Sequence, residues 1–205
     1  AVTVLTSDDL DKKQISTFVD ISAIAPGVNV AKNEGFKTVI TIRGVGYETN
    51  QNAIATPSVS YHLDGIYIAS PYSLQTEFMD LERIEVLRGP QGTLFGQNST
   101  GGAINVITAA PSLEDSSSYG DITIGDYSLI KTRASFNRPL SETLAVRAPF
   151  ITHKRDGFTD NLSTGQDLDD ADSISARVRF LYQPSETFRA NFTAQIFDEN
   201  RNGSA

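Results

Sequence analysis

A glycine-rich stretch between two apolar segments constrains the fold of this chain more than any other feature of the sequence. It occupies residues 87–108, LRGPQGTLFGQNSTGGAINVIT, with apolar residues at both ends. Glycine tolerates positive φ angles and lets two backbones approach closely. The stretch therefore predicts a strand, a set of compact turns and a second strand.

The spacing of the glycines does not match the common phosphate-binding loops. A P-loop needs a Gly-Lys pair followed by Ser or Thr, and the sequence contains no Gly-Lys pair. Gly44 and Gly46 have the spacing that opens a dinucleotide fingerprint, but Thr49 stands where the third glycine is needed. An enzyme built on this loop is therefore disfavoured, whereas an ordinary glycine-rich turn is still compatible with the composition.

The first half of the chain alternates short apolar runs with turn signals, which predicts a small α+β unit with a mixed sheet and short helices. We expect Ser7, Asp8 and Asp9 to supply the N-cap and acidic first turn of a helix around Leu10. Asp64-Gly65 predicts a hairpin turn. The other expected elements are strands at 2–5, 39–43, 82–87 and 103–108, and helices from Ser16 to about Ile24 and at 77–81.

The second half, from Tyr119 onward, shows apolar and polar residues in strict alternation. This period of two predicts about five long strands, each long enough to cross a bilayer when tilted. The expected connections are short turns at 137–141 and 183–186 and a long acidic loop at about 155–172. Alternating short and long connections are typical of a membrane barrel, although a soluble β-sandwich also alternates. Pro149 falls inside the third strand, which suggests either a bulge or a wrong strand assignment.

Composition excludes several classes of function. The formal net charge of -8 disfavours a nucleic-acid partner, and the absence of cysteine excludes a disulfide scaffold or a thiolate metal site. His62 and His153 are isolated on strand patterns, and the aspartates at 167–172 lack the spacing of a calcium loop. We therefore assign no catalytic residue, no metal and no cofactor. The sequence has no run of about 18 apolar residues, the length that would predict a transmembrane helix. No secretion signal is recognisable before Ala1.

Four motifs in order resemble the plug domain of TonB-dependent outer-membrane receptors. They are ERIEVLRGPQGTLFGQNSTGGAINVIT, which contains the glycine stretch, and IAPGVNV at 24–30, IRGVG at 42–46 and PSVSYHLDGIYI at 57–68. The resemblance implies an α+β plug over residues 1–111, a linker at 112–118 and antiparallel transmembrane β-barrel strands over 119–205. Family members have 22-stranded barrels, so we expect the barrel to be incomplete in this chain.

The resemblance also implies a function. Such a receptor lies in the outer membrane of a Gram-negative bacterium, in contact with lipid, and imports a scarce nutrient, most often a ferric siderophore. Its energy comes from TonB, which binds a short box that we expect upstream of this chain. Cobalamin or an oligosaccharide are alternative substrates, and a soluble β-rich module that binds glycans or proteins is the alternative of another class.

Two sets of candidate site residues follow from the resemblance. Arginines of the IRG and LRGP motifs, here Arg43 and Arg88, pair in the family with glutamates on the barrel wall, whereas local pairing with Glu82 or Glu85 is the simpler alternative. Three plug loops face the ligand in similar receptors. The candidates that they offer here are Tyr47, Glu48, Asn50, Gln51, Tyr72, Gln97 and Asn98.

Overall fold

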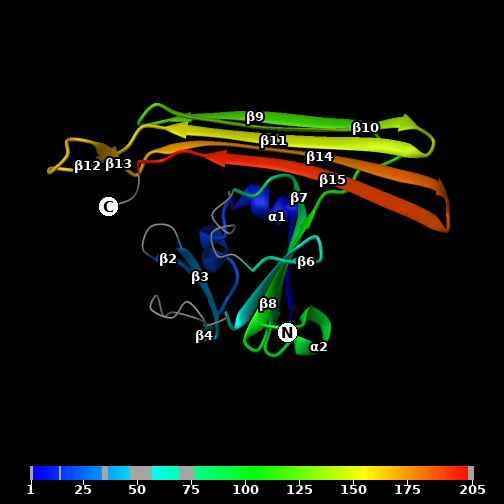
Figure 1. The fold of residues 1–205 in the computed structure, drawn as a ribbon, viewed down its shortest axis with the longest axis horizontal. Coiled ribbons are helices and arrows are strands. Elements are labelled where there is room, and N and C mark those ends of the chain that lie inside the picture. The colour runs from blue at the N-terminus through cyan, green and yellow to red at the C-terminus, as the bar shows by residue number, and fades with distance from the viewer. Residues whose placement is uncertain (1, 14, 34–36, 47–56, 70–76, 203–205) are drawn as a thin grey trace. The chain divides into compact units, whose positions relative to one another are not determined.

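The computed structural model describes residues 2–13, 15–33, 37–46, 57–69 and 77–202 (Figure 1). The chain divides into two compact units, unit 1 from Ala1 to Ala109 and unit 2 from Ala110 to Ala205. Within the described residues, no helix has both the length and the apolar character needed to cross a membrane. The two units are described separately below.

Unit 1 contains a five-stranded sheet and a three-stranded sheet. The larger sheet has the strand order β1-β7-β8-β5-β6, and β5 and β8 form its one parallel pair among the described strands. The smaller sheet has the order β2-β3-β4. The strands are β1 Val2–Thr6, β2 Val28–Asn33, β3 Lys37–Ile42, β4 Val45–Gly46, β5 Val59–Leu63, β6 Ile66–Tyr67, β7 Leu81–Arg88 and β8 Gly102–Thr108. The helices are α1 Ser7–Lys12, α2 Gly92–Phe95 and the 3-10 helix η1 Val19–Ala23.

The first helix confirms the prediction of a short helix around Leu10 but begins at a different cap. Thr6 is the N-cap of α1, and its side chain accepts from the Asp9 N–H while the Asp9 carboxylate accepts from the Thr6 N–H at 3.0 Å. The hydrogen bonds from Thr6 lower the pKa of Asp9. This reciprocal pair is a capping box, so the expected cap at Ser7 is wrong by one residue.

Two other expected helices are shorter or absent. Where the sequence predicts a helix from Ser16 to about Ile24, the structure has the single 3-10 turn η1. The Asp20 carboxylate accepts from the backbone N–H groups of Ser16 (3.0 Å) and Thr17 (2.8 Å), which closes this local turn. The expected helix at 77–81 is wrong, because its described residues lead without helix into β7.

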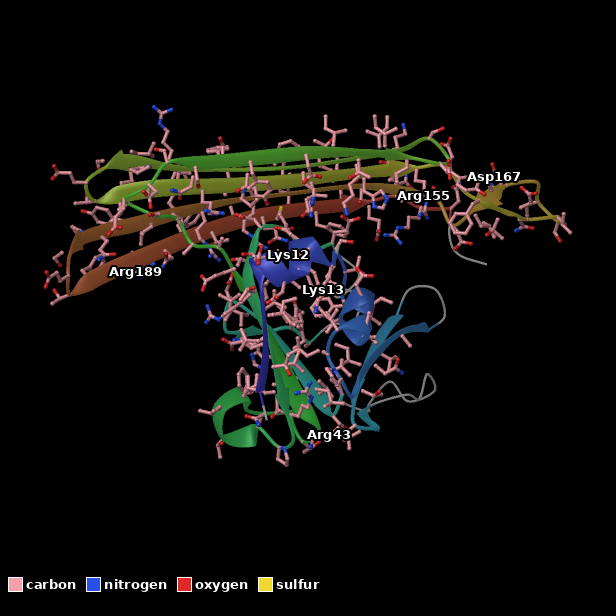
Figure 2. The ribbon with its side chains drawn as sticks, turned by 180° about the vertical axis from the view of Figure 1, so that it is seen from behind. Lys12, Lys13, Arg43, Arg155, Asp167 and Arg189 are labelled. Atoms are coloured by element: carbon pink, nitrogen blue, oxygen red, sulfur yellow. The ribbon has the colours of Figure 1, made fainter. Side chains whose placement is uncertain are left out.

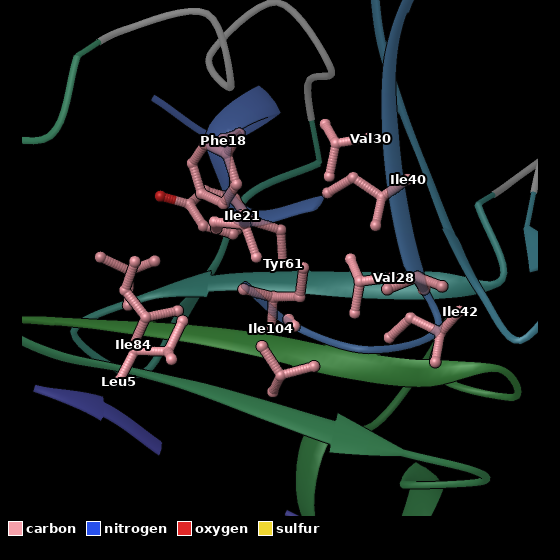
Figure 3. Packing of buried hydrophobic residues seen from close by; sticks show 14 of the residues in the cluster. Leu5, Phe18, Ile21, Val28, Val30, Ile40, Ile42, Tyr61, Ile84 and Ile104 are labelled. Carbon is pink, nitrogen blue, oxygen red and sulfur yellow. The ribbon is translucent and has the colours of Figure 1, made fainter. Parts of the chain in front are cut away.

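The core of unit 1 lies between the two sheets (Figure 3). Phe18 is at its centre, with its ring edge-on to Tyr61 (centroids 4.7 Å apart) and to Phe78 (4.8 Å). Apolar residues of β1, β2, β3, β5, β7, β8, α1 and η1 also belong to the cluster. Burial of these side chains is the main force that stabilises this unit.

Unit 2 is a five-stranded antiparallel sheet with the order β15-β14-β11-β10-β9 (Figure 1). Its strands are β9 Ser117–Gly125, β10 Leu129–Ser141, β11 Leu144–Arg155, β14 Ala171–Ser185 and β15 Phe188–Glu199. All five predicted long strands are confirmed. They run further than expected, so the short turns are at 142–143 and 186–187 rather than at 137–141 and 183–186.

The long acidic loop contains a small hairpin that the sequence did not predict. Its strands are β12 Thr159–Asp160 and β13 Asp167–Leu168. Pro149 lies within β11 and opposite Ser135 of β10. The pairing of β11 with β14 keeps the same register on both sides of this proline, so the strand assignment is right and no bulge occurs there.

Candidate functional site

Three motifs that lie far apart in the sequence meet at one end of unit 1. We call this region the motif end and define it as residues 26–28, 42–46 and 87–102. The Arg43 N–H donates to the Gly27 carbonyl at 2.7 Å, and the Gly89 N–H donates to the Gly101 carbonyl at 3.1 Å. β4 and α2 lie at this end in Figure 1. Three of the four resemblance motifs therefore contribute to one end of the unit.

Gly101 and Gly102 are two of the glycines that the packing of the motif end requires. A Cβ at Gly101 would come 2.8 Å from Cγ1 of Val45, and a Cβ at Gly102 would clash with the Leu87 carbonyl oxygen and come 2.8 Å from Cδ1 of Ile42. Gly102 also has a φ of 151°, a region that residues with a side chain rarely adopt. These glycines let β8 begin directly against the β3–β4 hairpin.

Arg43 occupies the turn of the β3–β4 hairpin rather than the end of the strand that the sequence predicted. Its φ is 52° and that of Gly44 is 77°, the left-handed pair that a tight two-residue hairpin turn requires. The side chain is exposed at the motif end (Figure 2). Within the described residues it forms no ion pair, so its guanidinium is accessible to an external carboxylate.

Arg88, by contrast, binds neighbouring parts of unit 1. Its Nε donates to the Pro26 carbonyl at 3.0 Å, and its Nη1 donates to Oγ1 of Thr3 at 2.7 Å. The side chain is half-buried. These bonds connect the end of β7 to β1 and to the turn before β2, and they fix the direction of the guanidinium.

Glu82 and Glu85 bind Arg83, a residue that the sequence analysis did not single out. Arg83 Nε donates to Glu85 Oε1 at 2.8 Å, and Arg83 also pairs with Glu82. Asn105 Nδ2 donates to Glu85 Oε2 at 3.0 Å. Burial alone would raise the pKa of Glu85, but the bonds from Asn105 and Arg83 outweigh it and lower that pKa. The hydrogen bond to Glu85 in turn raises the pKa of Arg83.

This pairing depends on strand register. Glu85 lies directly opposite Asn105 across the antiparallel β7–β8 pair, and Arg83 and Glu85 share a face because side chains alternate along a strand. Arg83 and Glu85 are two positions apart in one strand, and this spacing could have predicted their pairing from the sequence.

The candidate ligand-contact residues fall into two groups. Tyr47, Glu48, Asn50, Gln51 and Tyr72 lie outside the described residues. Gln97 and Asn98 lie in the turn after α2, where Gln97 is exposed and Asn98 has a φ of 63°. Asn98 Nδ2 donates to the Tyr67 hydroxyl at 2.7 Å, which leaves its carbonyl oxygen and one amide hydrogen for a ligand.

The aspartates of the long loop in unit 2 make structural contacts. Asp169 accepts from the Thr159 hydroxyl at 2.7 Å, and Asp170 accepts from the Asn202 N–H at 2.8 Å. Among the described residues, no three or more His, Cys, Asp or Glu side chains are grouped so that they could hold a metal ion.

Comparison with known proteins gives the same family throughout. The family model "TonB-dependent Receptor Plug Domain" matches residues 1–103. A pesticin receptor of Yersinia pestis is 32% identical over 171 residues, which are 80% of this chain and 24% of that protein. The ferric enterobactin receptor PirA of Pseudomonas aeruginosa is 26% identical over 196 residues, 86% of this chain and 26% of the relative.

A solved structure extends the likeness to both units. The crystal structure of the ferric yersiniabactin uptake receptor FyuA from Yersinia pestis matches with a TM-score of 0.82 at 25% identity, covering 95% of this chain and 31% of that chain. The fold predicted from the sequence, an α+β plug followed by antiparallel barrel strands, is thereby confirmed. The chain spans about a quarter of the length of the curated relatives named here.

Proposed function

The chain belongs to the TonB-dependent receptor plug domain family, and from this membership we propose that it supplies the plug and the first barrel strands of an outer-membrane receptor. The receptor binds a ferric siderophore outside a Gram-negative cell and imports it into the periplasm. TonB provides the energy by pulling on the plug. Transport of this kind changes no bond in the nutrient, and the proposal assigns no catalytic residue.

The observation that carries the proposal is the apolar outer face of unit 2. Along each strand one set of alternate residues is mostly apolar, and its large members are exposed; they include Ile122, Ile124, Ile130, Phe136, Phe150, Ile174, Tyr182, Phe188, Phe192 and Ile196. Ile124 is 79% exposed and Phe192 is 64% exposed. A continuous apolar sheet face of this size is unstable in water and stable against lipid. The soluble binding module is therefore the weaker alternative.

The motif end suggests how the plug is held. We propose that Arg43, exposed and without an ion pair among the described residues, binds a carboxylate on the barrel wall. Arg88, fixed by Pro26 and Thr3, presents a second guanidinium in a set direction. Arginine forms strong bidentate pairs with carboxylates, and such pairs hold the plug in place while remaining breakable under force. Glu82 and Glu85 pair instead with Arg83, so neither is part of this proposed contact.

Substrate choice rests on the relatives. Two of the receptors to which the chain is similar are named for an iron chelate, ferric enterobactin and ferric yersiniabactin. By extension we propose a ferric chelate here, recognised in part by the exposed amide of Gln97 and the carbonyl of Asn98.

Uptake by intact cells tests the proposal. Cells expressing the receptor that carries this chain are given radiolabelled ferric chelates, with TonB present or deleted. We expect accumulation of label only when TonB is present. TonB-dependent uptake of cobalamin or an oligosaccharide, without iron uptake, would replace the substrate. No energised uptake of any of these would contradict the transport function and favour a binding role.

A further inference from the structure

A carboxylate of unit 1 holds the chain at the point where it leaves the last strand of that unit. Thr108, the last residue of β8, is 2% exposed. Its N–H donates to Asp64 Oδ1 at 2.8 Å, and its hydroxyl donates to Asp64 Oδ2 at 2.7 Å. The next residue, Ala109, donates its N–H to the Asp80 carbonyl at 2.9 Å. The chain is therefore fixed within unit 1 as far as residue 109.

The chain is fixed again shortly afterwards by a buried asparagine of unit 2. Asn137 of β10 is 3% exposed. Its Oδ1 accepts from the Ser112 N–H at 2.9 Å, and its Nδ2 donates to the Ser112 carbonyl at 3.3 Å and to the Asp115 carbonyl. The Ser112 hydroxyl oxygen accepts in turn from the N–H groups of Glu114 (3.2 Å) and Asp115 (3.3 Å). Residues 112–115, which belong to the segment expected as a linker, are thus bound to β10.

Only residues 110 and 111 lie between these two fixed points. Each residue extends a chain by at most about 3.6 Å, so the stretch from residue 109 to residue 112 spans at most about 11 Å. If Asn137 did not hold residues 112–115, the next fixed point would be the start of β9 at Ser117. The stretch that could extend would then span up to about 29 Å. Asn137 therefore keeps the connection between the two units short.

The chemistry of the asparagine side chain suits it to this contact. An amide offers an oxygen acceptor and two N–H donors, and Asn137 directs both its oxygen and its nitrogen to the backbone of residues 112–115. A buried amide costs free energy unless its polar atoms are hydrogen-bonded, so packing alone would favour an apolar side chain here. The bonds hold the connecting segment through its backbone, whatever its side chains are.

We infer that Asn137 is a positioning residue that anchors the connection between the units while unit 1 is pulled. The inference rests on the proposed function in one respect, namely that TonB pulls on unit 1 from its N-terminal side. A connection that lengthens lets the whole of unit 1 follow the pull. A connection that stays short holds the C-terminal end of unit 1, so that the same pull acts on the contacts within the unit.

Amide hydrogen exchange in the full-length protein that carries this chain measures the anchor directly. Asn137→Ala removes the acceptor of the Ser112 N–H and should raise the exchange of that group about tenfold, the effect of losing a buried hydrogen bond. Asn191→Ala, at an exposed asparagine of β15, is the matched control and should leave Ser112 unchanged. Unchanged exchange at Ser112 in Asn137→Ala, or an equal rise throughout β10 and β11, would overturn the anchor.

A second variant keeps the test informative if Asn137→Ala fails to fold. An insertion of about six Gly and Ser residues between residues 110 and 111 lengthens the connection and leaves the bonds of Asn137 in place. The same insertion in the turn at 142–143 also lies in unit 2 but does not lengthen the connection, so it is the matched control.

Binding and uptake of a radiolabelled ferric chelate by intact cells complete the test. In cells without TonB, Asn137→Ala and the insertion at 110–111 should bind the chelate as the unaltered protein does. In cells with TonB, both should lose most of the uptake, whereas the two controls should retain it. This split between binding and uptake supports the inference, because a role confined to local structure would not produce it.

Two results would overturn the role of the anchor in transport. One is undiminished uptake by both altered proteins, and the other is a loss of binding equal to the loss of uptake. If the unaltered protein neither binds nor imports a ferric chelate, while Asn137→Ala still raises the exchange of Ser112, the proposed function fails and the role under pulling fails with it. The hydrogen bonds of Asn137 would stand in that case.

Discussion

The two units of this chain differ in where their large apolar side chains lie: those of unit 1 are buried in a core, and those of unit 2 are exposed on a sheet face. Phe18 in unit 1 is 1% exposed and has aromatic neighbours, whereas Phe192 in unit 2 is 64% exposed on a sheet face. Both units obey the same alternation along their strands. The difference shows that they are built for different surroundings: unit 1 forms a core that excludes water, and unit 2 presents a surface that suits lipid.

The most disruptive change to unit 1 should be the loss of its central ring. Phe18→Ala removes the contacts with Tyr61 and Phe78 and leaves a cavity, so we expect the unfolding free energy of unit 1 to fall by about 3–5 kcal/mol. Urea-dependent amide exchange of β7 and β8 measures this fall in the unfolding free energy. Phe192→Ala is the matched change in unit 2 and should leave those amides unaffected. A loss below about 1 kcal/mol in Phe18→Ala would show that the ring is not central to the core.

The apolar face of unit 2 is tested by introducing a charge. Phe192→Lys places an ammonium on the outer face of β15 and should destabilise the protein in bilayers by about 2–4 kcal/mol. Asn191→Lys puts the same charge one residue earlier, on the opposite face, and should cost much less. Unfolding from lipid vesicles in urea compares them. Equal effects of the two lysines would refute the assignment of the lipid-facing side.

Glycine requirements should also differ between the units. Gly102→Ala forces a Cβ into a backbone with a φ of 151° and toward Ile42, and we expect it to destabilise unit 1 by about 1–3 kcal/mol. At Gly120 in β9 a Cβ would meet its nearest atom at an ordinary 3.5 Å, so Gly120→Ala should be close to neutral. Thermal unfolding of the two variants distinguishes them. If Gly102→Ala were neutral, close packing at the motif end would not require this glycine.

Acid should weaken unit 1 through His62. Burial lowers the pKa of this imidazole below its usual value, and the hydrogen bond with the Gly65 backbone only partly opposes this. Folding therefore favours the neutral imidazole. The contribution of His62 to the stability of unit 1 is complete above the unfolded-state pKa of about 6.5, and it is lost as the pH falls toward the lower folded-state pKa. On the same side of the sheet as His62, strand register places Asn105 of β8 next to it and Glu85 of β7, which binds Arg83, beyond Asn105.

The stability of unit 1 between pH 8 and pH 5, measured by urea-dependent exchange, tests this dependence. His62→Phe should flatten the profile in the range where the histidine titrates, and His153→Phe in unit 2 should not. A profile that is the same with and without His62 would contradict the link between its burial and stability.

Local patterns predicted the elements that depend on near neighbours. Alternation gave the five strands of unit 2, and Asp64-Gly65 gave the β5–β6 hairpin with positive φ at both residues. The Arg43-Gly44 turn was missed because an arginine with a φ of 52° is rare. A 3-10 turn replaced the expected second helix because Asp20 binds the preceding N–H groups.

Contacts set by register were out of reach from the sequence. The pairing of Glu85 with Asn105 needs the antiparallel β7–β8 register, and the place of His62 beneath Phe95 needs the fold of the glycine-rich stretch. The motifs named Arg43 and Arg88 as candidate residues at the motif end. They did not predict that Arg88 would bind Pro26 and Thr3 while Arg43 stays exposed.

Lipid quenching at single positions is the measurement that tests the contrast between the units most directly. The chain contains no cysteine, so one fluorophore can be attached at Phe192→Cys, at Asn191→Cys or at Leu94→Cys, which is an exposed site of unit 1. The protein is then placed in vesicles of brominated lipid. We expect strong quenching at position 192 and little at positions 191 and 94. Equal quenching at 191 and 192, or none at 192, would contradict the claim that the apolar face of unit 2 lies against the membrane.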